Sequence, residues 1–391
     1  MDNETLIEMT STLATVFSAT VSPDCNVGDP YLLVPRFWLA VVFGITISII
    51  SIVFNSFVFV IFFTNKQHRN SYNLYLLLLA MFDVFMGISY IAVISVKVLI
   101  NWTVSYTLKA IWVMYMVPML TVSHIAQTAS SFLIIFAAIE RYCITVNSDK
   151  VKFLQNHRKA IVFVAVMCGV ISKGTILKEI TVARNPDCPG TVGEWYLEPS
   201  SLVIKHELFN KIWRFYFRNV FTILAPFFIV LYLNAGLIYR LQEHSLILKS
   251  GSLVQDKQIV KQKKARIRAA TRTLVMIVFT YLISNLLSVI ITIWEYLDSA
   301  SLFSEPVLPF YVMSVDAISL LTIVASCLRL PIYITCQPLL RKEMFQFISQ
   351  IWTQKLMSRR LTLIENSQLT AESLVNNADN ESPSFGKIEF V

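Results

Sequence analysis

Residues 110–142 read AIWVMYMVPMLTVSHIAQTASSFLIIFAAIERY, and this stretch decides the fold class. Residues 110–139 carry no formal charge, although His124 lies among them, and Glu140-Arg141-Tyr142 closes the stretch. About 20 apolar residues in a helix cross a bilayer. The stretch therefore predicts a transmembrane helix that ends in a charged acid–base pair.

Six further apolar stretches predict an all-α membrane protein, a bundle of seven transmembrane helices within residues 37–336. Of the 391 residues 55% are hydrophobic and only 15% are charged, whereas about a quarter are charged in soluble proteins. The fourth stretch is the weakest, because Lys173, Lys178 and Glu179 interrupt it. The six stretches are 37–63, 72–96, 158–180, 219–239, 274–294 and 306–336.

The distribution of Lys and Arg predicts how the chain lies in the plasma membrane. Residues 240–272 hold nine basic residues and two acids, whereas residues 1–36 hold five acids and one Arg. Basic loops stay in the cytoplasm, so we expect the tail 1–36 outside and the tail 358–391 inside. The net charge of +8 then belongs to the inner face, and no nucleic-acid partner is needed to explain it.

Two kinds of modification are expected on the outer side. Asn3 and Asn101 begin glycosylation sequons there. Of the six cysteines, only Cys25 and Cys188 face the oxidising side, so a disulfide between them is the leading hypothesis. Two unpaired thiols remain the alternative, since pairing does not follow from sequence.

After the seventh stretch, residues 337–357 contain apolar residues at helical spacing, such as Leu340, Met344 and Phe347, with Arg341 and Lys342 between them. This pattern predicts a short amphipathic helix that lies on the inner surface of the lipid bilayer. The tail 358–391 is polar and rich in Ser, Thr and Asn, which suits phosphorylation.

An enzyme is not indicated. The sequence has no nucleophile–base arrangement, no Gly-rich phosphate loop and no His or Cys cluster with metal spacing. We therefore expect no cofactor and no metal.

Polar residues at membrane depth mark function or a structural pair. Asp83 lies in the middle of the second stretch and Asn55 in the middle of the first, and the seventh contains Arg329-Leu330-Pro331-Ile332-Tyr333. An unpaired Arg there would be costly, so we expect Arg329 to pair with Asp83. Whether that pair switches or is only structural stays open.

The arrangement resembles rhodopsin-like G-protein-coupled receptors. Glu140-Arg141-Tyr142 matches that family's third span, where Arg141 pairs with Glu140 at rest and is released toward a G-protein helix. The resemblance implies a heterotrimeric G protein and arrestin as partners. It also implies a sodium site at Asp83, Asn55 and Ser130, to which the Arg329 pair is the alternative.

The chain departs from that family's pattern at three places. Leu330 replaces the usual Asn before Pro331 and Tyr333, and Met116 replaces the usual disulfide Cys. Asn285 stands where the sixth span has Pro, so a kink there must come from local bonding of Asn285 or be absent.

Within the family, residues 37–352 resemble nematode receptors for FMRFamide-like neuropeptides. The matching motifs are Tyr281-Leu282-Ile283-Ser284-Asn285, Trp294-Glu295, Tyr115-Met116-Val117-Pro118 and Arg329-Leu330-Pro331-Ile332-Tyr333. The ligands of that group are short peptides that end in Arg-Phe-amide.

Such a ligand needs an acid for its guanidinium and aromatic residues for its ring. The acids that close or enter the outer ends of spans are Asp316, our first choice, with Glu295 and Glu179. The aromatic candidates are Trp294, Tyr115, His124 and Trp112, each with simple packing as the alternative. A chemosensory receptor of the same fold is one alternative function, and a transporter or channel is a second alternative function.

Overall fold

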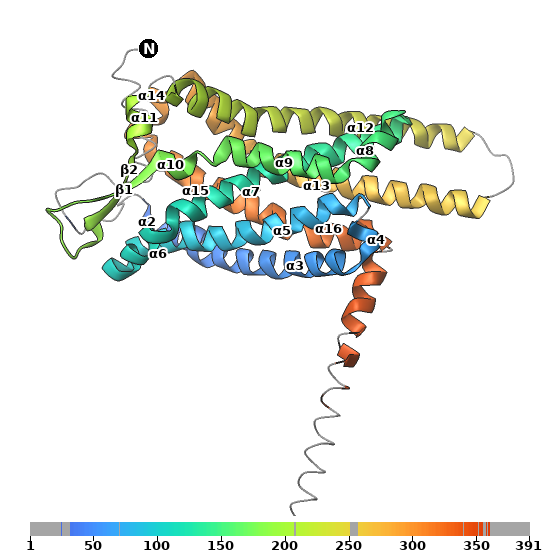
Figure 1. Cartoon of the computed structure of the whole chain (residues 1–391), viewed down its shortest axis with the longest axis horizontal. Coiled ribbons are helices and arrows are strands. Elements are labelled where there is room, and N and C mark those ends of the chain that lie inside the picture. The colour runs from blue at the N-terminus through green and yellow to red at the C-terminus, as the bar shows by residue number, and fades with distance from the viewer. Residues whose placement is uncertain are drawn as a thin grey trace, which may run out of the picture. The chain divides into compact units, whose positions relative to one another are not determined.

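The computed structural model describes residues 25, 32–69, 71–206, 209–250, 257–338, 340–350, 352–354, 357 and 359. The chain divides into two units, Met1–Gln337 and Pro338–Val391. The first unit holds the helix bundle (Figure 1). Asn3, the tail 1–31 apart from Cys25, and the tail beyond Arg359 lie outside the described residues.

Within the described residues, seven helices are long and apolar enough to cross a membrane, which confirms the predicted fold class. The third, Tyr106–Val146, is longer than its uncharged stretch 110–139, because the helix continues through its polar ends. The seven spans are Leu33–Thr64, Asn73–Thr103, Tyr106–Val146, Arg158–Glu179, Val220–Arg240, Arg268–Leu297 and Leu308–Cys336.

Several spans are built from consecutive helical segments. In span order the main ones are α2 (Leu33–Arg36), π-helical η1 (Phe37–Phe43) and α3 (Gly44–Thr64); α5 (Asn73–Tyr90), π-helical η2 (Ile91–Ser95) and α6 (Val96–Thr103); α7 (Tyr106–Val146); α9 (Arg158–Lys173) and α10 (Ile176–Glu179); π-helical η5 (Val220–Leu224) and α12 (Ala225–Ser250); α13 (Lys257–Leu297); and α15 (Leu308–Cys327) and α16 (Arg329–Cys336). The connecting helices are α4 (Lys66–Arg69), α8 (Lys150–Asn156), α11 (Ser201–Lys205), π-helical η4 (Phe209–Phe217) and α14 (Ser299–Leu302).

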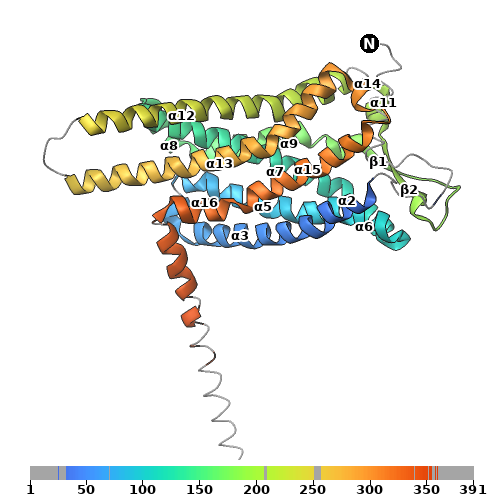
Figure 2. The same ribbon diagram turned by 180° about the vertical axis from the view of Figure 1, so that it is seen from behind.

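The long helices lie side by side in one bundle (Figures 1 and 2), and their contacts form a closed ring that includes α7. Around the ring α3 packs on α5, α5 on α7, α7 on α12, α12 on α13, α13 on α15, and α15 on α3 again. Helix α9 packs against α7 only from outside this ring. Among the long helices that the structure describes, α7 is therefore the main neighbour of the fourth span.

Gly169 permits this contact between α9 and α7. A Cβ atom at Gly169 would lie 2.8 Å from the Ile125 carbonyl oxygen and 3.4 Å from the Ala129 Cβ. Small residues let helices approach closely in membranes, where packing rather than water expulsion drives association.

One end of the bundle carries a β-hairpin, which the sequence did not predict. Strand β1 (Ile180–Arg184) pairs antiparallel with β2 (Trp195–Pro199), with Ile180 opposite Pro199 and Arg184 opposite Trp195. We call this the hairpin end, and the opposite end the Glu140 end (Figure 1). A two-stranded hairpin is only marginally stable by itself, so its short strands leave little trace in the local sequence.

The second unit contains the short helix that follows the seventh span, described over residues 340–350. Its existence confirms the helix predicted for 337–357, while its place on the bilayer stays a prediction. Asn101, the second predicted glycosylation site, is a half-buried residue of α6.

We expect Gly169→Val to lower the thermal unfolding temperature of the purified protein in detergent, because the added side chain forces α9 away from α7. Overpacking of this kind costs about 1–3 kcal/mol. Ile171→Val, at an exposed position two residues further along α9, is the matched control. Equal unfolding temperatures for both variants would contradict the packing role of Gly169.

Candidate functional site

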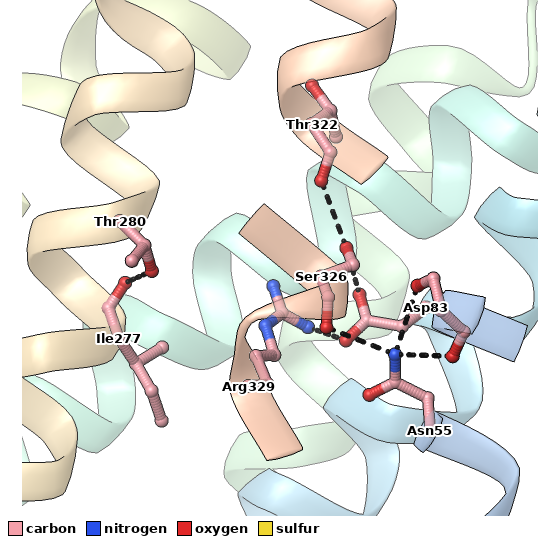
Figure 3. A network of polar contacts seen from close by, with 8 residues as sticks. Asn55, Asp83, Ile277, Thr280, Thr322, Ser326 and Arg329 are labelled. Carbon is pink, nitrogen blue, oxygen red and sulfur yellow. Dashed lines mark hydrogen bonds and ion pairs between the residues drawn. The ribbon is translucent and has the colours of Figure 1, made fainter. Parts of the chain in front are cut away.

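The centre of the bundle is organised around Asp83 of α5, whose side chain is fully buried. Its carboxylate accepts a hydrogen bond from Ser326 Oγ at 2.9 Å and forms an ion pair with Arg329 (Figure 3). Span seven is interrupted at Leu328, between α15 and α16, directly before Arg329. Of the two arrangements that the sequence left open, the ion pair is present in this structure.

Asn55 joins this centre from the first span. Its Nδ2 donates to the carbonyl oxygens of Ser326 at 3.1 Å and Ser51 at 2.9 Å (Figure 3). Spans one, two and seven are thus connected by polar groups at one level. Tyr333 of α16 is 1% exposed, and its ring packs against that of Phe62. Pro331 lies between Arg329 and Tyr333 in the sequence of α16.

A small cavity lies beside the ion pair, lined by both polar and apolar residues. Ser130 of α7, Arg329 and Asn285 of α13 are among its lining residues. About 20 Å³ of it is open to the centres of water molecules, which suffices for a single water. The hydroxyl of Ser130 is buried and has no hydrogen-bond partner in the described structure.

Asn285 forms a local hydrogen bond within α13. Its Nδ2 donates to the Tyr281 carbonyl oxygen, one turn back, at 2.9 Å. Helix α13 runs without a break through this position. One turn away, Tyr281 Oη donates to Ser131 Oγ at 3.2 Å and links α13 to α7.

At the Glu140 end, the arrangement differs from the expected pairing of Arg141 with Glu140. Glu140 is fully buried and is bound by Arg158 of α9, through Nε at 3.1 and 3.2 Å and through Nη2 at 2.5 Å. Arg141 instead lies over the ring of Tyr72, 3.8 Å from its centroid. The physical reason is that Arg158 already occupies both carboxylate oxygens of Glu140, which leaves the Arg141 guanidinium to lie on the Tyr72 ring.

Two further contacts close this end. Tyr142 lies against Gly236 of α12, where a Cβ atom would be 3.2 Å from the Tyr142 ring. Arg272 Nη2 of α13 donates to the Cys336 carbonyl oxygen at 3.2 Å, at the end of α16. Span six is therefore tied to span seven here.

A second, larger cavity opens at the hairpin end, with about 110 Å³ open to the centres of water molecules. Glu179, the last residue of α10, is 3% exposed and accepts from Arg218 Nη1 at 2.7 and 2.9 Å. A second guanidinium, that of Arg214, lies 3.4 Å from Glu179. The lining residues are Leu120, His124, Ile176, Glu179, Ile180, Leu197, Glu198, Pro199, Arg214 and Arg218.

Of the ligand residues predicted from sequence, Glu179 and His124 line this cavity. Asp316 is 4% exposed and accepts from Arg36 Nε at 2.7 Å. Sequence reasoning missed this partner, because Arg36 stands just outside the uncharged stretch 37–63 and reads as a tail residue. Glu295 interacts electrostatically with Arg214, near the cavity.

The predicted aromatic residues have other neighbours. Trp112 is 1% exposed and its Nε1 donates to the Val93 carbonyl oxygen at 3.2 Å. Tyr115 Oη donates to the Ala92 carbonyl oxygen at 3.0 Å. Trp294 packs against a core cluster that includes Tyr311.

The hairpin is fixed by a disulfide between Cys25 and Cys188, whose Cα atoms are 5.4 Å apart. This confirms the leading hypothesis from the sequence. The Gly193 N–H donates to the Cys25 carbonyl oxygen at 3.0 Å, and a Cβ at Gly193 would lie 2.9 Å from that oxygen. Gly193 therefore allows Cys25 to lie directly on the hairpin.

Glu194 holds the hairpin from within. Its carboxylate accepts from the Gly190 N–H and from Arg184 Nε, both at 2.7 Å. These bonds, the Gly190 N–H foremost, hold the pKa of the Glu194 carboxyl below its usual range, because they favour the ionised form.

The model of the 7 transmembrane receptor (rhodopsin family) matches residues 54–332, more than half of the chain. The chain belongs to this family. The receptor is accordingly a multi-pass plasma-membrane protein that responds to an extracellular ligand and signals through G proteins. A comparison with curated proteins finds no match.

Membership of this family also bears on two alternative functions, that of an enzyme and that of a transporter or channel. Receptors of this fold are typically not enzymes, and no group of three or more metal-binding side chains occurs among the receptor's described residues. The match favours a receptor over the transporter or channel alternative.

We expect Arg329→Gln to destabilise the receptor, because it leaves Asp83 as an unpaired charge in the bundle. Loss of one partner of a buried pair costs about 3–5 kcal/mol, whereas Asp83→Asn with Arg329→Gln should cost less than the two single changes together. Thermal unfolding of the four proteins measures this coupling. Additive losses would show that the two side chains do not act as a pair.

The same four proteins distinguish an ion pair between Asp83 and Arg329 from a sodium ion bound at Asp83. If Arg329 takes the place of the ion, replacing choline chloride by sodium chloride leaves the wild-type unfolding temperature unchanged. The Arg329→Gln receptor, whose Asp83 has lost its guanidinium, should gain sodium-dependent stability. Sodium-dependent stability of the wild type would contradict this view.

Low pH should destabilise the hairpin, because it protonates the Glu194 carboxylate. Because its folded pKa is lowered, its stabilising effect is complete above its unfolded pKa and is lost as pH falls through the folded value. Between about pH 6 and pH 3, the wild-type unfolding temperature should fall more steeply than that of Glu194→Gln. Glu198 is an exposed acid of the same hairpin. The unfolding temperature of Glu198→Gln should therefore depend on pH as steeply as that of the wild type.

Proposed function

We propose that the receptor binds a short amidated neuropeptide of the FMRFamide-like kind at the hairpin end and activates a heterotrimeric G protein at the Glu140 end. The N-terminus is extracellular and the C-terminus cytoplasmic in this proposal. The observation that carries it is the hairpin-end cavity, whose wall combines four charged side chains with apolar ones. Pockets of mixed chemistry suit ligands with both a charge and an apolar group, as in Arg-Phe-amide.

The guanidinium of such a peptide requires a carboxylate that does not already form an ion pair with an arginine of the receptor. Glu179 is bound by Arg218 and Asp316 by Arg36. Glu198 lines the cavity and Glu295 lies near Arg214. Within the described part of the chain, neither of these two acids has an ion-pair partner within 4.0 Å. We therefore assign the peptide guanidinium to Glu295 and Glu198 in place of Asp316.

The aromatic end of the peptide meets the apolar wall. Leu120, Ile176 and Leu197 supply that wall, and the His124 ring lies beside them. The space of about 110 Å³ accommodates one end of a peptide rather than all of it. The remainder would extend along the hairpin, which the Cys25–Cys188 disulfide holds in place.

On the cytoplasmic side, the proposed G-protein surface comprises Glu140-Arg141-Tyr142 and the basic segment 261–272. Arrestin binding to the phosphorylated tail 358–391 and contact of the 337–357 helix with lipid complete the proposed partners. The positive charge of this face also favours anionic lipid.

The ligand class is tested in cells that express the receptor, by G-protein dissociation after challenge with amidated peptides, starting from Phe-Met-Arg-Phe-amide. We expect responses that are lost when the terminal amide is replaced by a free acid. Silence across the panel, with surface expression confirmed, would shift the weight to the chemosensory reading.

Substitution then tests the acids. Glu295→Gln should weaken a peptide that contains Arg by about tenfold, as for loss of a charge-assisted hydrogen bond, and should weaken its citrulline analogue far less. Asp298→Asn, an exposed acid three residues further on, is the matched control. Equal losses for both peptides would remove Glu295 from the site.

A further inference from the structure

In this structure the Arg141 guanidinium lies against an aromatic ring. It is 6% exposed, and its guanidinium lies 3.8 Å from the centroid of the Tyr72 ring. Tyr72 directly precedes α5, so the ring belongs to a different span from Arg141. Nη2 of Arg141 is buried and has no hydrogen-bond partner among the described residues. The cation–π contact is therefore the principal contact of this charge.

The neighbouring acid is engaged elsewhere. Arg158, at the start of α9, approaches both oxygens of Glu140 with two nitrogens. Such fork-shaped pairs are the strongest charge-assisted hydrogen bonds in proteins. Glu140 is fully buried, so it cannot exchange Arg158 for water at low cost.

We propose that Tyr72 and Arg158 are positioning residues that set how readily Arg141 is released to the G protein. Tyr72 holds the guanidinium at rest, and Arg158 keeps Glu140 from capturing it. The proposal rests on G-protein coupling, which the family implies, and not on the identity of the ligand.

The two residues have opposite effects on signalling. Removing the Tyr72 ring removes the resting contact of Arg141, so the released state becomes more populated. Removing the Arg158 charge leaves Glu140 buried without its partner, and Arg141 is then the adjacent cation that can neutralise it. A purely structural role for either side chain would change the amount of folded receptor but not the activity of each folded molecule.

The experiment measures ligand-free nucleotide exchange, so it does not depend on the proposed peptide. Full-length receptor in lipid nanodiscs is mixed with purified heterotrimeric G protein, and the initial rate of GTPγS uptake is expressed per folded receptor. The variants are Tyr72→Leu and Tyr72→Phe, with Arg158→Gln and Arg158→Lys.

Tyr72→Leu should raise the ligand-free rate about thirtyfold, since a desolvated cation–π contact contributes about 2 kcal/mol. Tyr72→Phe keeps the ring face and should stay near the wild-type rate. Arg158→Gln should lower the rate, and Arg158→Lys, which keeps the charge, should lower it less. Equal rates for Tyr72→Leu and Tyr72→Phe, or a raised rate for Arg158→Gln, would overturn the proposal. If Tyr72→Leu does not fold, the two Arg158 variants carry the test alone.

Discussion

A carboxylate buried among transmembrane helices has to be neutralised by a partner within the protein, and this receptor does so four times with arginine. Asp83 pairs with Arg329, Asp316 with Arg36, Glu140 with Arg158, and Glu179 with Arg218. The pairs join span two to seven, one to seven, three to four, and four to the start of five. Because an unpaired charge at these positions would cost several kcal/mol, each pair fixes which helices are neighbours.

The pairs also divide the receptor into a hairpin end, a polar centre and a Glu140 end. Between the ends, Asn55, Ser326 and Asp83 form a connected polar group, and Tyr281 ties α13 to α7 beside it. A ligand changes the state of such a bundle only by binding one arrangement better than another. Weaker contacts, such as Arg272 on the Cys336 carbonyl oxygen, can break at lower cost than the buried pairs.

The sequence was sufficient for the seven spans, because apolar length is a local property that each span carries by itself. It also indicated Asp83 with Arg329, since both lie inside apolar stretches and an unpaired charge there is costly. It did not indicate Arg36 for Asp316 or Arg158 for Glu140, because both arginines border their spans and read as ordinary loop charges. The hairpin escaped prediction because its two strands are short, and because the disulfide that fixes it joins the loop between the strands to the distant Cys25.

We propose that a peptide site at the hairpin end is coupled to the G-protein surface at the Glu140 end. The most direct measurement is saturation binding of the most active amidated peptide to the receptor in nanodiscs, with and without nucleotide-free G protein. Coupling between two sites is reciprocal, so G protein should raise peptide affinity by at least about fivefold, and GTPγS should reverse the gain. Saturable binding with the same affinity in both conditions would contradict the claim.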